Sequence, residues 1–492
     1  MTGFAHRCGV HSAPREAAVR EVLAQVRSAG VDLVRVSWCD LHGVLRGKVL
    51  VASQLQRAFE EGISFVSTLM LKDTADRTAL PVFERGGTAA LPGFGQANNL
   101  VLLPDPASFS LLPWAAGNGW LRAEPFFSDG QAVPLDTRGV LQRALARLAD
   151  AGYGMRCGLE VEFHVYRLRS DSLHHDPHQA AWPGPAPTVD LLHPGYALLA
   201  EASFDATEDV LRIVQQTAQG LQLPLSSLEV EFGPSQFEAV FEATDALTAA
   251  DNMVRFRNGV RMALHRAGYH ATFMCRPPFP NIMSSGWHLH QSLLRTADGS
   301  NAFMREAPAA GSSPLDAAHT LSATGEHYLA GLLAHARAMA VLCTPTSNGF
   351  ARFRPNALAP QSVLWGRDNR GAMLRVLGGG GDQATRIENR LGEPAANPYL
   401  YVASQLFAGL DGIQRGLRAP PATESPYGSD AVRLPAGLAE ALTAMNADPV
   451  MTAGLGPELA HVFTRAKELE LARLAEAPDG DEFMRREYFA RI

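Results

Sequence analysis

The run GLEVEFHVY, residues 158–166, decides the class of fold, because polar and apolar side chains largely alternate along it. Glu160 and Glu162 are two residues apart, and alternate side chains of a β-strand lie on one face of the sheet. We therefore expect a strand whose apolar face packs on helices while its other face presents two carboxylates to a cavity. For any single run of this kind, a half-buried sheet with a solvated outer face is the simpler alternative.

Three later runs repeat the alternation and carry charged or imidazole groups at every second residue. Solvated strand faces usually mix Lys and Thr with Glu, whereas these runs contain carboxylates, imidazoles and guanidinium groups and no Lys. Taken together, the runs therefore favour one shared polar cavity over separate solvated faces. They are LEVEFGPSQFE with Glu229, Glu231 and Glu238, GWHLHQSL with His288 and His290, and TRIENRL with Arg386, Glu388 and Arg390.

Several carboxylates on one face would repel one another and raise each other's pKa unless divalent cations neutralise them. Oxygen ligands with an imidazole suit magnesium or manganese better than zinc. Transfer of a phosphoryl group needs such metal ions together with guanidinium groups that stabilise the developing charge. The runs therefore predict a polyphosphate site with Mg²⁺ or Mn²⁺. The segment 347–376 supplies guanidinium groups at Arg352, Arg354, Arg367, Arg370 and Arg375.

Other nucleotide-binding and catalytic signatures are missing from the sequence. No GxxxxGK[ST] loop occurs, and the run GGGGD at Gly378 lacks the Lys of such a loop. There is no GxSxG motif and no Cys with a convincing His partner, so nucleophilic catalysis has no candidate. The predicted ATP site is therefore not a P-loop.

The composition is that of an ordinary globular protein. The 492 residues are 46% hydrophobic and 19% charged, and the formal net charge is -7. Because Lys and Arg are scattered, nucleic acid is not an expected partner. The five Cys residues include no CxxC pair, and the sequence has neither a signal-peptide core nor a run of roughly 20 apolar residues. We expect a cytoplasmic protein with no disulfide framework and no membrane partner.

The chain divides into a short first part and a long second part. A helix is expected over 14–30, followed by a β-hairpin that turns at His42 and Gly43. A stretch rich in Pro, Gly and Trp interrupts the periodicity, and we place the boundary near Leu112, with domains 1–112 and 113–492. Helices and short strands then alternate, which predicts an α+β fold. Helical patterns cover 137–151, 206–221 with Asp205 as N-cap, 246–267, 314–343 and 398–417.

The ordered motifs resemble those of the glutamine synthetase superfamily over nearly the whole chain. GLEVEF, EFGPSQFE, SGWHLHQSL, PTSNGFARF, RIENR and ANPYL occur in the family's order, and the tail from LPAGL to REYF is similar to its C-terminal helices. The resemblance implies a small N-terminal β-grasp domain and a large catalytic domain whose strands form a funnel flanked by helices. It also implies a homo-oligomeric ring, commonly a dodecamer, in which each active site lies between neighbouring subunits.

The resemblance also assigns roles by motif position. It implies an ATP-dependent ligase that activates a carboxylate, glutamate by default, as an acyl-phosphate that an amine then attacks. Glu162, Glu231 and Glu238 would hold the metal ion near the acyl substrate, and Glu160, His288 and Glu388 the one that bridges the ATP phosphates. By the same resemblance, Arg352, Gly286 and Trp287 would bind the acyl substrate, and Arg390 would act as a catalytic residue beside that substrate. Arg370 would act as a catalytic residue on the transferring phosphate. The nucleotide and its phosphates would contact Arg375, Arg386, His290 and Ser292.

Two positions depart from true glutamine synthetases, which bind ammonium with an Asp in an FDGSS-like loop and a Glu after the first active-site Arg. The corresponding stretches read FVSTLML, with Val66 at the Asp position, and RFRPNALAP, with Leu358 at the Glu position. Apolar side chains remove both the attraction for ammonium and the base that would deprotonate it. The remaining likeness is to γ-glutamyl amide ligases, which accept alkylamines, anilines, ethanolamine or polyamines. A neutral or apolar amine is favoured, although Asp73 and Asp76 lie close enough in sequence to supply charge.

Several alternatives stay open at this stage. The Asn-Gly pair that contacts glutamate in the family reads Met283–Ser284 here, so the acid substrate is undecided. Trp287 is either a substrate contact or, as is usual for a large aromatic in a strand, core packing. Glu229 is extra to the family pattern, and Gln383 stands where many members have a nucleotide-contacting Lys. A true glutamine synthetase and an inactive structural ring are the competing functions, and retention of every metal position argues against the inactive ring.

Overall fold

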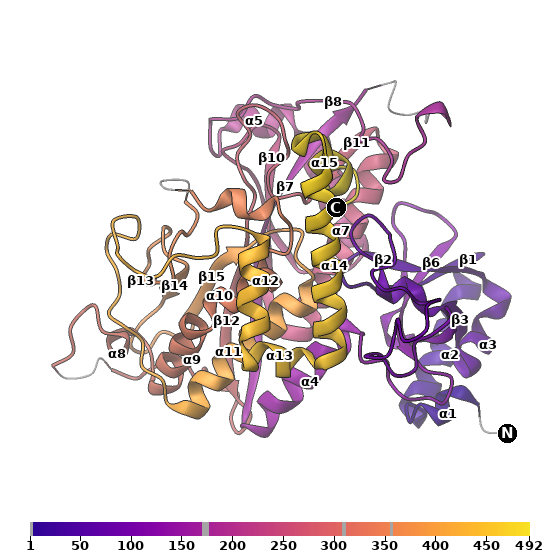
Figure 1. Cartoon of the computed structure of the whole chain (residues 1–492), viewed down its shortest axis with the longest axis horizontal. Coiled ribbons are helices and arrows are strands. Elements are labelled where there is room, and N and C mark those ends of the chain that lie inside the picture. Colours follow the sequence, from indigo (N-terminus) through magenta and orange to yellow (C-terminus); the bar gives the residue numbers. More distant parts are fainter. Residues whose placement is uncertain (1–2, 170–176, 308–310, 355–357) are drawn as a thin grey trace.

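The computed structural model describes residues 3–169, 177–307, 311–354 and 358–492. Within these residues the chain forms two β-sheets with helices around them, and the first sheet lies to one side of the second (Figure 1). The α+β class predicted from the sequence is confirmed.

The first sheet is built from the N-terminal residues. Its strand order is β2-β1-β6-β4-β3, with β5 paired to β6 and with β1 and β6 as parallel neighbours. The predicted hairpin is confirmed, since β1 and β2 pair antiparallel and the Asp40 carboxylate accepts the N–H groups of His42 and Val44, each at 2.9 Å. The elements are α1 Phe4–Arg7, α2 Ala13–Ser28, β1 Leu33–Cys39, β2 Leu45–Val51, α3 Leu55–Glu61, β3 Ile63–Val66, β4 Asn99–Pro104, β5 Ser110–Leu111 and β6 Asn118–Phe126.

The last strand of this sheet lies beyond the predicted domain limit. β6 follows Leu112 in sequence and pairs with both β1 and β4. The division into 1–112 and 113–492 stays a prediction, and the first sheet takes in residues as far as Phe126.

The second sheet holds the four charged runs. Its order is β13-β14-β15-β12-β7-β10-β9, and β8 and β11 pair with β7. β7 (Tyr153–Leu168) has antiparallel neighbours in β10 and β12, so runs that are far apart in the sequence lie side by side. The other strands are β8 Val189–Asp190, β9 Leu225–Val230, β10 Gln236–Asp245, β11 Tyr269–Thr272, β12 Trp287–Arg295, β13 Trp365–Arg367, β14 Leu374–Leu377 and β15 Arg386–Gly392.

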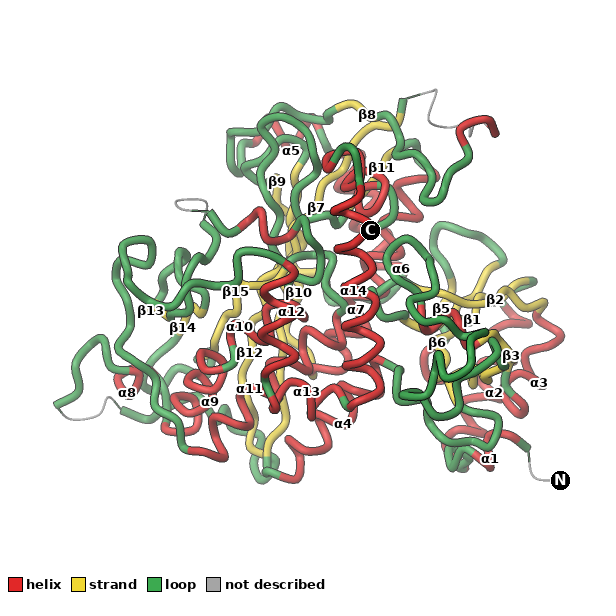
Figure 2. The backbone as a smooth tube through the Cα atoms, in the orientation of Figure 1, coloured by secondary structure: helices red, strands yellow, loops and turns green. Residues whose placement is uncertain are grey.

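Helices surround the second sheet, and some of them stand between the two sheets (Figures 1 and 2). α11 (Pro398–Arg415) is buried along most of its length and contacts α4, α7, α9 and α10. α7 (Ala246–Arg266) packs on β7, β10 and β11. The other helices are α4 Thr137–Asp150, α5 Glu201–Ala206, α6 Glu208–Gly220, α8 Ala317–Thr320, α9 Ala323–Ala334, α10 Ala336–Cys343, α12 Leu438–Ala447, α13 Pro449–Leu455, α14 Pro457–Glu476 and α15 Gly480–Met484.

Two helix predictions are wrong in detail. Asp205 lies inside α5, and α6 begins at Glu208 after Thr207, so Asp205 is not an N-cap. The pattern over 314–343 is divided into α8, α9 and α10, because Ser322 caps a new helix by accepting the Gly325 N–H. One apolar periodicity therefore continues across helices that the backbone separates.

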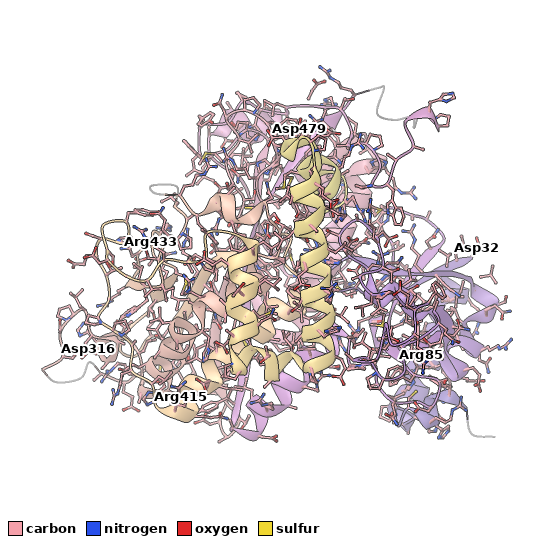
Figure 3. All side chains as sticks on the ribbon, viewed as in Figure 1. Asp32, Arg85, Asp316, Arg415, Arg433 and Asp479 are labelled. Atoms are coloured by element: carbon pink, nitrogen blue, oxygen red, sulfur yellow. The ribbon has the colours of Figure 1, made fainter. Side chains whose placement is uncertain are left out.

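The surface carries charges of both signs. Asp316 and Arg433 lie on one side of the outline, and Asp32 and Arg85 lie on the other (Figure 3). This distribution agrees with the scattered Lys and Arg residues of the sequence. Across the described ranges, no helix combines the length and the apolar character required to cross a bilayer.

Candidate active site

Most of the predicted metal ligands lie on one face of the second sheet, because the strand registers place them opposite one another. Opposed residues of neighbouring strands point to the same side of a sheet. The exception is Glu231, which directly follows β9. The facing pairs are Glu160 with His288, Glu162 with Glu238, Glu238 with Glu229, and Glu388 with His290.

Glu160 and Glu388 are carboxylates with cationic or donor partners. Glu160 Oε1 accepts a hydrogen bond from His290 Nε2 at 2.8 Å, and its Oε2 lies 3.3 Å from His288 Nδ1. Burial by itself would raise the pKa of both carboxyls, but the two imidazoles hold the pKa of Glu160 below its usual range. His288 and Arg390 do the same for the pKa of Glu388. Both groups are therefore anionic at neutral pH.

The carboxylates around Glu238 are not balanced in this way. Glu238 Oε1 is buried and has no hydrogen-bond partner among the described residues. Burial and the neighbouring Glu162 and Glu231 raise the pKa of Glu238 to about 11. Burial and Glu231 also raise the pKa of Glu162 to about 7, although Arg352 opposes the shift. A divalent cation between these carboxylates would restore their charged form, so the donor set fits the predicted metal ion.

Among the described residues there are three groups of possible metal ligands, and within each group the ligand atoms all lie within 4.8 Å of one another. They overlap the predicted sets without coinciding with them, because Glu229 joins the group around Glu238 and His290 joins Glu160. Glu229 therefore belongs to the cluster, and the exact ligands of each ion stay a prediction. The sets are Glu160, His290 and Glu388; Glu160, Glu238 and His288; and Glu229, Glu231 and Glu238.

Glu162 is oriented by neutral donors. Its Oε2 accepts the Gly286 N–H at 2.9 Å and Gln236 Nε2 at 3.1 Å. Gln236 also donates to Ser285 Oγ at 3.1 Å, and that hydroxyl lies 3.2 Å from His164 Nδ1. Sequence reasoning named Gly286 but missed Gln236, Ser285 and His164, although Gln236 lies in the same run as the predicted metal ligands Glu231 and Glu238, which is a usable signal.

Two buried arginines lie beside the carboxylates. Arg352 donates to the Arg390 carbonyl at 2.8 Å and lies 3.3 Å from His288 Nε2. Arg390 donates to the Leu358 carbonyl at 3.1 Å. A Cβ on Gly286 would lie 2.5 Å from the Arg352 guanidinium, so only glycine allows this approach. The structure thus brings both predicted acyl-substrate arginines and Gly286 to the metal-binding face.

Arg375 and Arg370 occupy different surroundings. Arg375 lies 3.0 Å from Glu388 Oε2 and also contacts Asp368 at 3.0 Å. Arg370 is exposed and lines a separate cavity of about 490 Å³ with Arg367 and Asp368. The structure therefore joins Arg375 to the site and leaves Arg370 in the turn between β13 and β14.

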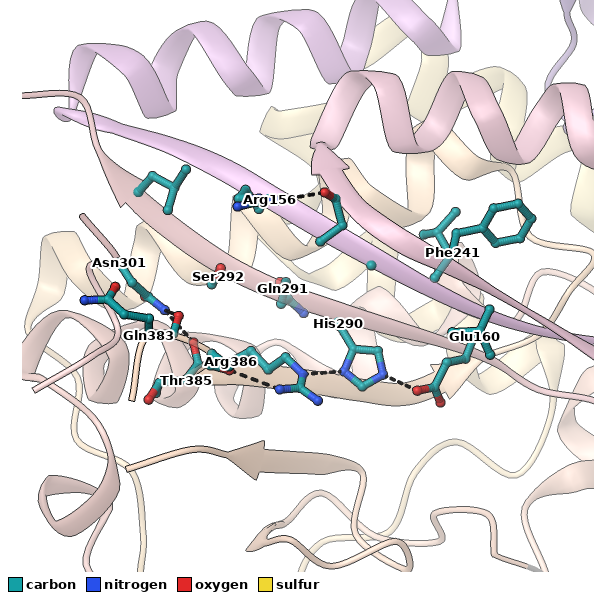
Figure 4. A pocket seen from close by; sticks show the side chains of 16 residues that line it. Arg156, Glu160, Phe241, His290, Gln291, Ser292, Asn301, Gln383, Thr385 and Arg386 are labelled. Atoms are coloured by element: carbon teal, nitrogen blue, oxygen red, sulfur yellow. Dashed lines mark hydrogen bonds and ion pairs between the residues drawn. The ribbon is translucent and has the colours of Figure 1, made fainter. Parts of the chain in front are cut away.

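A cavity of about 370 Å³ opens beside His290 (Figure 4). His290 Nδ1 accepts from Arg386 Nε at 3.1 Å, while its other nitrogen faces Glu160. Ser292, Arg386 and Gln383 also line the cavity, so three of the four predicted nucleotide residues share it, whereas Arg375 does not line it. Sequence reasoning missed Arg156, Val240, Phe241, Leu294 and Asn301, because these lining residues come from separate segments without a common spacing.

Trp287 has a packing role. Its side chain is 0% exposed and meets Tyr401 edge to face, with ring centroids 4.8 Å apart. It lies on the opposite face of β12 from His288, because successive side chains of a strand alternate. The structure therefore places the indole in the core rather than in the cavity.

Leu358 and Val66, the two positions predicted to line the site of the amine acceptor, lie in different parts of a single chain. Leu358 is 62% exposed and adjoins Arg390 through its carbonyl. Val66 ends β3 in the first sheet, and this sheet lies to one side of the second sheet, which carries the carboxylates (Figure 1). Within a single chain, only Leu358 is next to the site.

The acidic residues near Val66 are already paired. Asp73 is buried and lies 3.1 Å from Arg473 Nε. Asp76 lies 2.7 Å from Arg46 Nη1. Neither carboxylate is free to attract an amine, so the expectation that they supply charge to the acceptor is not supported.

Comparisons with known proteins agree with this geometry. A family model described as glutamine synthetase, catalytic domain, matches residues 134–486. The γ-glutamylanilide synthase of an Acinetobacter species is 36% identical over 468 residues, which cover 94% of this chain and 91% of that protein. The γ-glutamylethanolamide synthetase GlnA4 of Streptomyces coelicolor is 30% identical over 92% of each chain. The glutamine synthetase of Halobacterium salinarum is 32% identical over 92% of this chain and 93% of that protein.

A solved structure described as a GmaS/ADP complex has a TM-score of 0.74 and 28% identity, over 94% of this chain and 98% of that chain. Fold, carboxylate-lined site and relatives together define a ligase that forms carbon–nitrogen bonds. The family model covers more than half of the sequence, and the chain belongs to the glutamine synthetase family.

Proposed function

We propose that this protein is an ATP-dependent ligase that joins the γ-carboxylate of glutamate to an amine other than ammonia, with Mg²⁺ or Mn²⁺ as its metal ion. The observation that carries the proposal is Glu238, whose buried oxygen has no partner among the described residues and lies among other carboxylates. Buried carboxylates with a purely structural role are normally paired. Similarity to γ-glutamylanilide and γ-glutamylethanolamide synthetases supports an amide product.

In this proposal the glutamate γ-carboxylate attacks the terminal phosphate of ATP, which forms an acyl-phosphate and releases ADP. The amine nitrogen then attacks the acyl carbon, phosphate leaves and the amine loses one proton. Bound divalent cations would neutralise the phosphate oxygens. The carboxylates and His288 would hold these ions, Arg375 would face the transferring phosphate, and Arg352 and Arg390 would bind the acyl substrate.

The acceptor is proposed to be an apolar amine. Leu358 and Val66 replace the carboxylates that attract ammonium in true glutamine synthetases, and Asp73 and Asp76 are bound to arginines. An entrance of this kind favours an aniline over ammonium or a polyamine, because no free carboxylate of these residues compensates a positive charge.

We further propose a cytoplasmic homo-oligomeric ring, by resemblance a dodecamer. In such a ring Val66 of the N-terminal domain would reach the catalytic domain of the neighbouring subunit. A domain division between the first sheet and α4 agrees with a family match that begins at residue 134. Light scattering of the purified protein would measure the mass, and a monomer would contradict this part of the proposal.

The direct test supplies purified protein with ATP, Mg²⁺ and glutamate and compares aniline, ethanolamine, a polyamine and ammonia. We expect phosphate release and a γ-glutamyl amide, identified by mass spectrometry, with an amine other than ammonia. The Glu238→Gln variant should give neither. A second candidate, glutamine synthetase, is favoured by similarity to the Halobacterium salinarum enzyme. Product with ammonia alone would establish that function instead, and no product with any acceptor would refute both.

A further inference from the structure

The carboxylate site has an exposed aromatic pair beside it. Phe232 directly follows Glu231 and is 41% exposed, and Tyr196 is 50% exposed. The two rings meet edge to face, with centroids 5.3 Å apart and planes at 86°. Leu198 and Leu199, which follow Tyr196 closely in sequence, are also half exposed. Burial of such rings is favourable, so the surface suits a ligand with an apolar part.

Hydrogen bonds attach this pair to the carboxylates. The Phe232 N–H donates to Glu231 Oε2 at 2.9 Å, and the Tyr196 N–H donates to the Phe232 carbonyl at 2.6 Å. The Tyr196 hydroxyl donates to the Asn281 carbonyl at 2.5 Å. Phe232 is therefore held directly beside Glu231, a member of the cluster around Glu238, and Tyr196 is held against Phe232.

Positive charge near the pair disfavours a cationic ligand. Arg276 interacts electrostatically with Tyr196 and Arg354, and burial together with Arg354 lowers the pKa of Arg276. Arg276 also donates to Ser284 Oγ at 3.3 Å, so its guanidinium adjoins the loop that leads into β12. Guanidinium groups repel alkylammonium ions, whereas an aryl amine is neutral at pH 7. Charge and apolar surface therefore select the same chemical class.

We propose that Phe232, with Tyr196 packed against it, holds the aromatic ring of an aryl amine and so determines the acceptor specificity of the enzyme. The inference rests on the ligase function proposed above and deepens it by naming the side chains that would recognise the acceptor. The ring of the acceptor would complete an aromatic cluster with this pair while its amine nitrogen reaches the acyl carbon. The bonds formed and broken are those of the ligase reaction.

The test compares kcat and KM for aniline with those for hydroxylamine, a small neutral nucleophile that traps acyl-phosphates and has no ring. Phe232→Ala should raise the KM for aniline about two- to tenfold, which is the range of one aromatic contact, and leave the hydroxylamine constants unchanged. Phe232→Leu should have an intermediate effect, because it keeps apolar bulk without the aromatic ring. Phe83→Ala, which removes an 80% exposed Phe of the N-terminal part, is the matched control and should change neither.

Three results would overturn the inference. One is an unchanged aniline KM in Phe232→Ala, and another is an equal loss with aniline and hydroxylamine, which indicates damage to the site as a whole. The third is a change in oligomeric mass on light scattering, which would assign the aromatic pair to a subunit contact. Wild-type protein that is inactive with every acceptor would refute the ligase function itself, and this outcome is visible before any variant is made.

Discussion

Two buried groups of charged side chains in this protein differ in how their charges are balanced. The group around Glu238 brings carboxylates together, and burial and mutual repulsion raise the pKa values of Glu238 and Glu162. The second group, which we call the tail network, links the residues after β3 to α14 and the C-terminal end. Its members are Asp73, Lys467, Glu470, Arg473 and Glu487, and each is buried or nearly so.

The tail network satisfies its charges internally. Arg473 lies 3.1 Å from Asp73 Oδ2 and donates to Glu487 Oε2 at 2.9 Å, and Lys467 donates to Glu470 at 2.8 Å. Removal of a charge from water is costly, so a network of this kind persists because each ion has an opposite partner. Buried charge alone therefore does not mark an active site, whereas buried charge without a partner indicates a ligand.

The largest expected effect tests the paired group. Arg473→Ala would leave Asp73 and Glu487 buried without their cation, and should lower the free energy of unfolding by about 3–5 kcal/mol. Thermal and denaturant unfolding measure this loss. Arg20→Ala, at a guanidinium that is 71% exposed, is the control and should change little. A folded Arg473→Ala protein with full stability but no ligase activity would mean that the tail network serves the reaction rather than the stability of the fold.

The next effect tests the unpaired group. Glu238→Gln should lower ligase activity by at least about 100-fold, since even supporting residues of metal sites cost 10–100-fold. The same change should not lower the melting temperature of metal-free protein, because a pKa of about 11 leaves Glu238 protonated at neutral pH and Gln is a neutral side chain of the same shape. Glu242→Gln, an exposed position on the same strand, should keep its activity. Marked destabilisation by Glu238→Gln would mean that this carboxyl stabilises the fold.

Metal binding should affect only one of the two groups. Mg²⁺ at about ten times its Kd should stabilise the wild type by about 1.4 kcal/mol. The same addition should give a smaller shift in Glu238→Gln and an undiminished shift in a mild tail-network variant such as Lys467→Met. Differential scanning fluorimetry with and without EDTA makes the measurement. Equal shifts in wild type and Glu238→Gln would exclude Glu238 as a ligand.

The smallest effect is a pH dependence of the metal-free protein. In the folded state the pKa values of Glu238 and Glu162 are raised above the ordinary value of 4.5. Between pH 4.5 and these raised pKa values, the folded state therefore binds more protons than the unfolded state. Stability must then fall as pH rises, by about 1 kcal/mol between pH 7 and pH 8. Mg²⁺ should abolish this decrease of stability with pH, and the Glu238→Gln substitution should remove most of it. A flat profile between pH 7 and pH 8 would show that these carboxyls are charged without metal.

Much of the site was predictable because strand alternation is a local property. Glu160 and Glu162, or His288 and His290, share a face whatever the strand pairs with, and the N-terminal hairpin at His42 followed from its own turn residues. Helix boundaries were less predictable, as the wrong N-cap at Asp205 and the divided pattern over 314–343 illustrate. There, side-chain caps and packing override a continuous apolar period.

The amino-acid order alone was enough to establish which chemical groups this protein gathers and in which succession its motifs occur, since both depend on residue type and on the two-residue period of a strand. Three-dimensional packing decided that Glu229 joins the carboxylates, that Trp287 faces the core, that Asp73 is bound to a residue 400 positions away and that Tyr196 meets Phe232. Such facts depend on strand register and on contacts between distant segments, and neither leaves a local trace in the sequence.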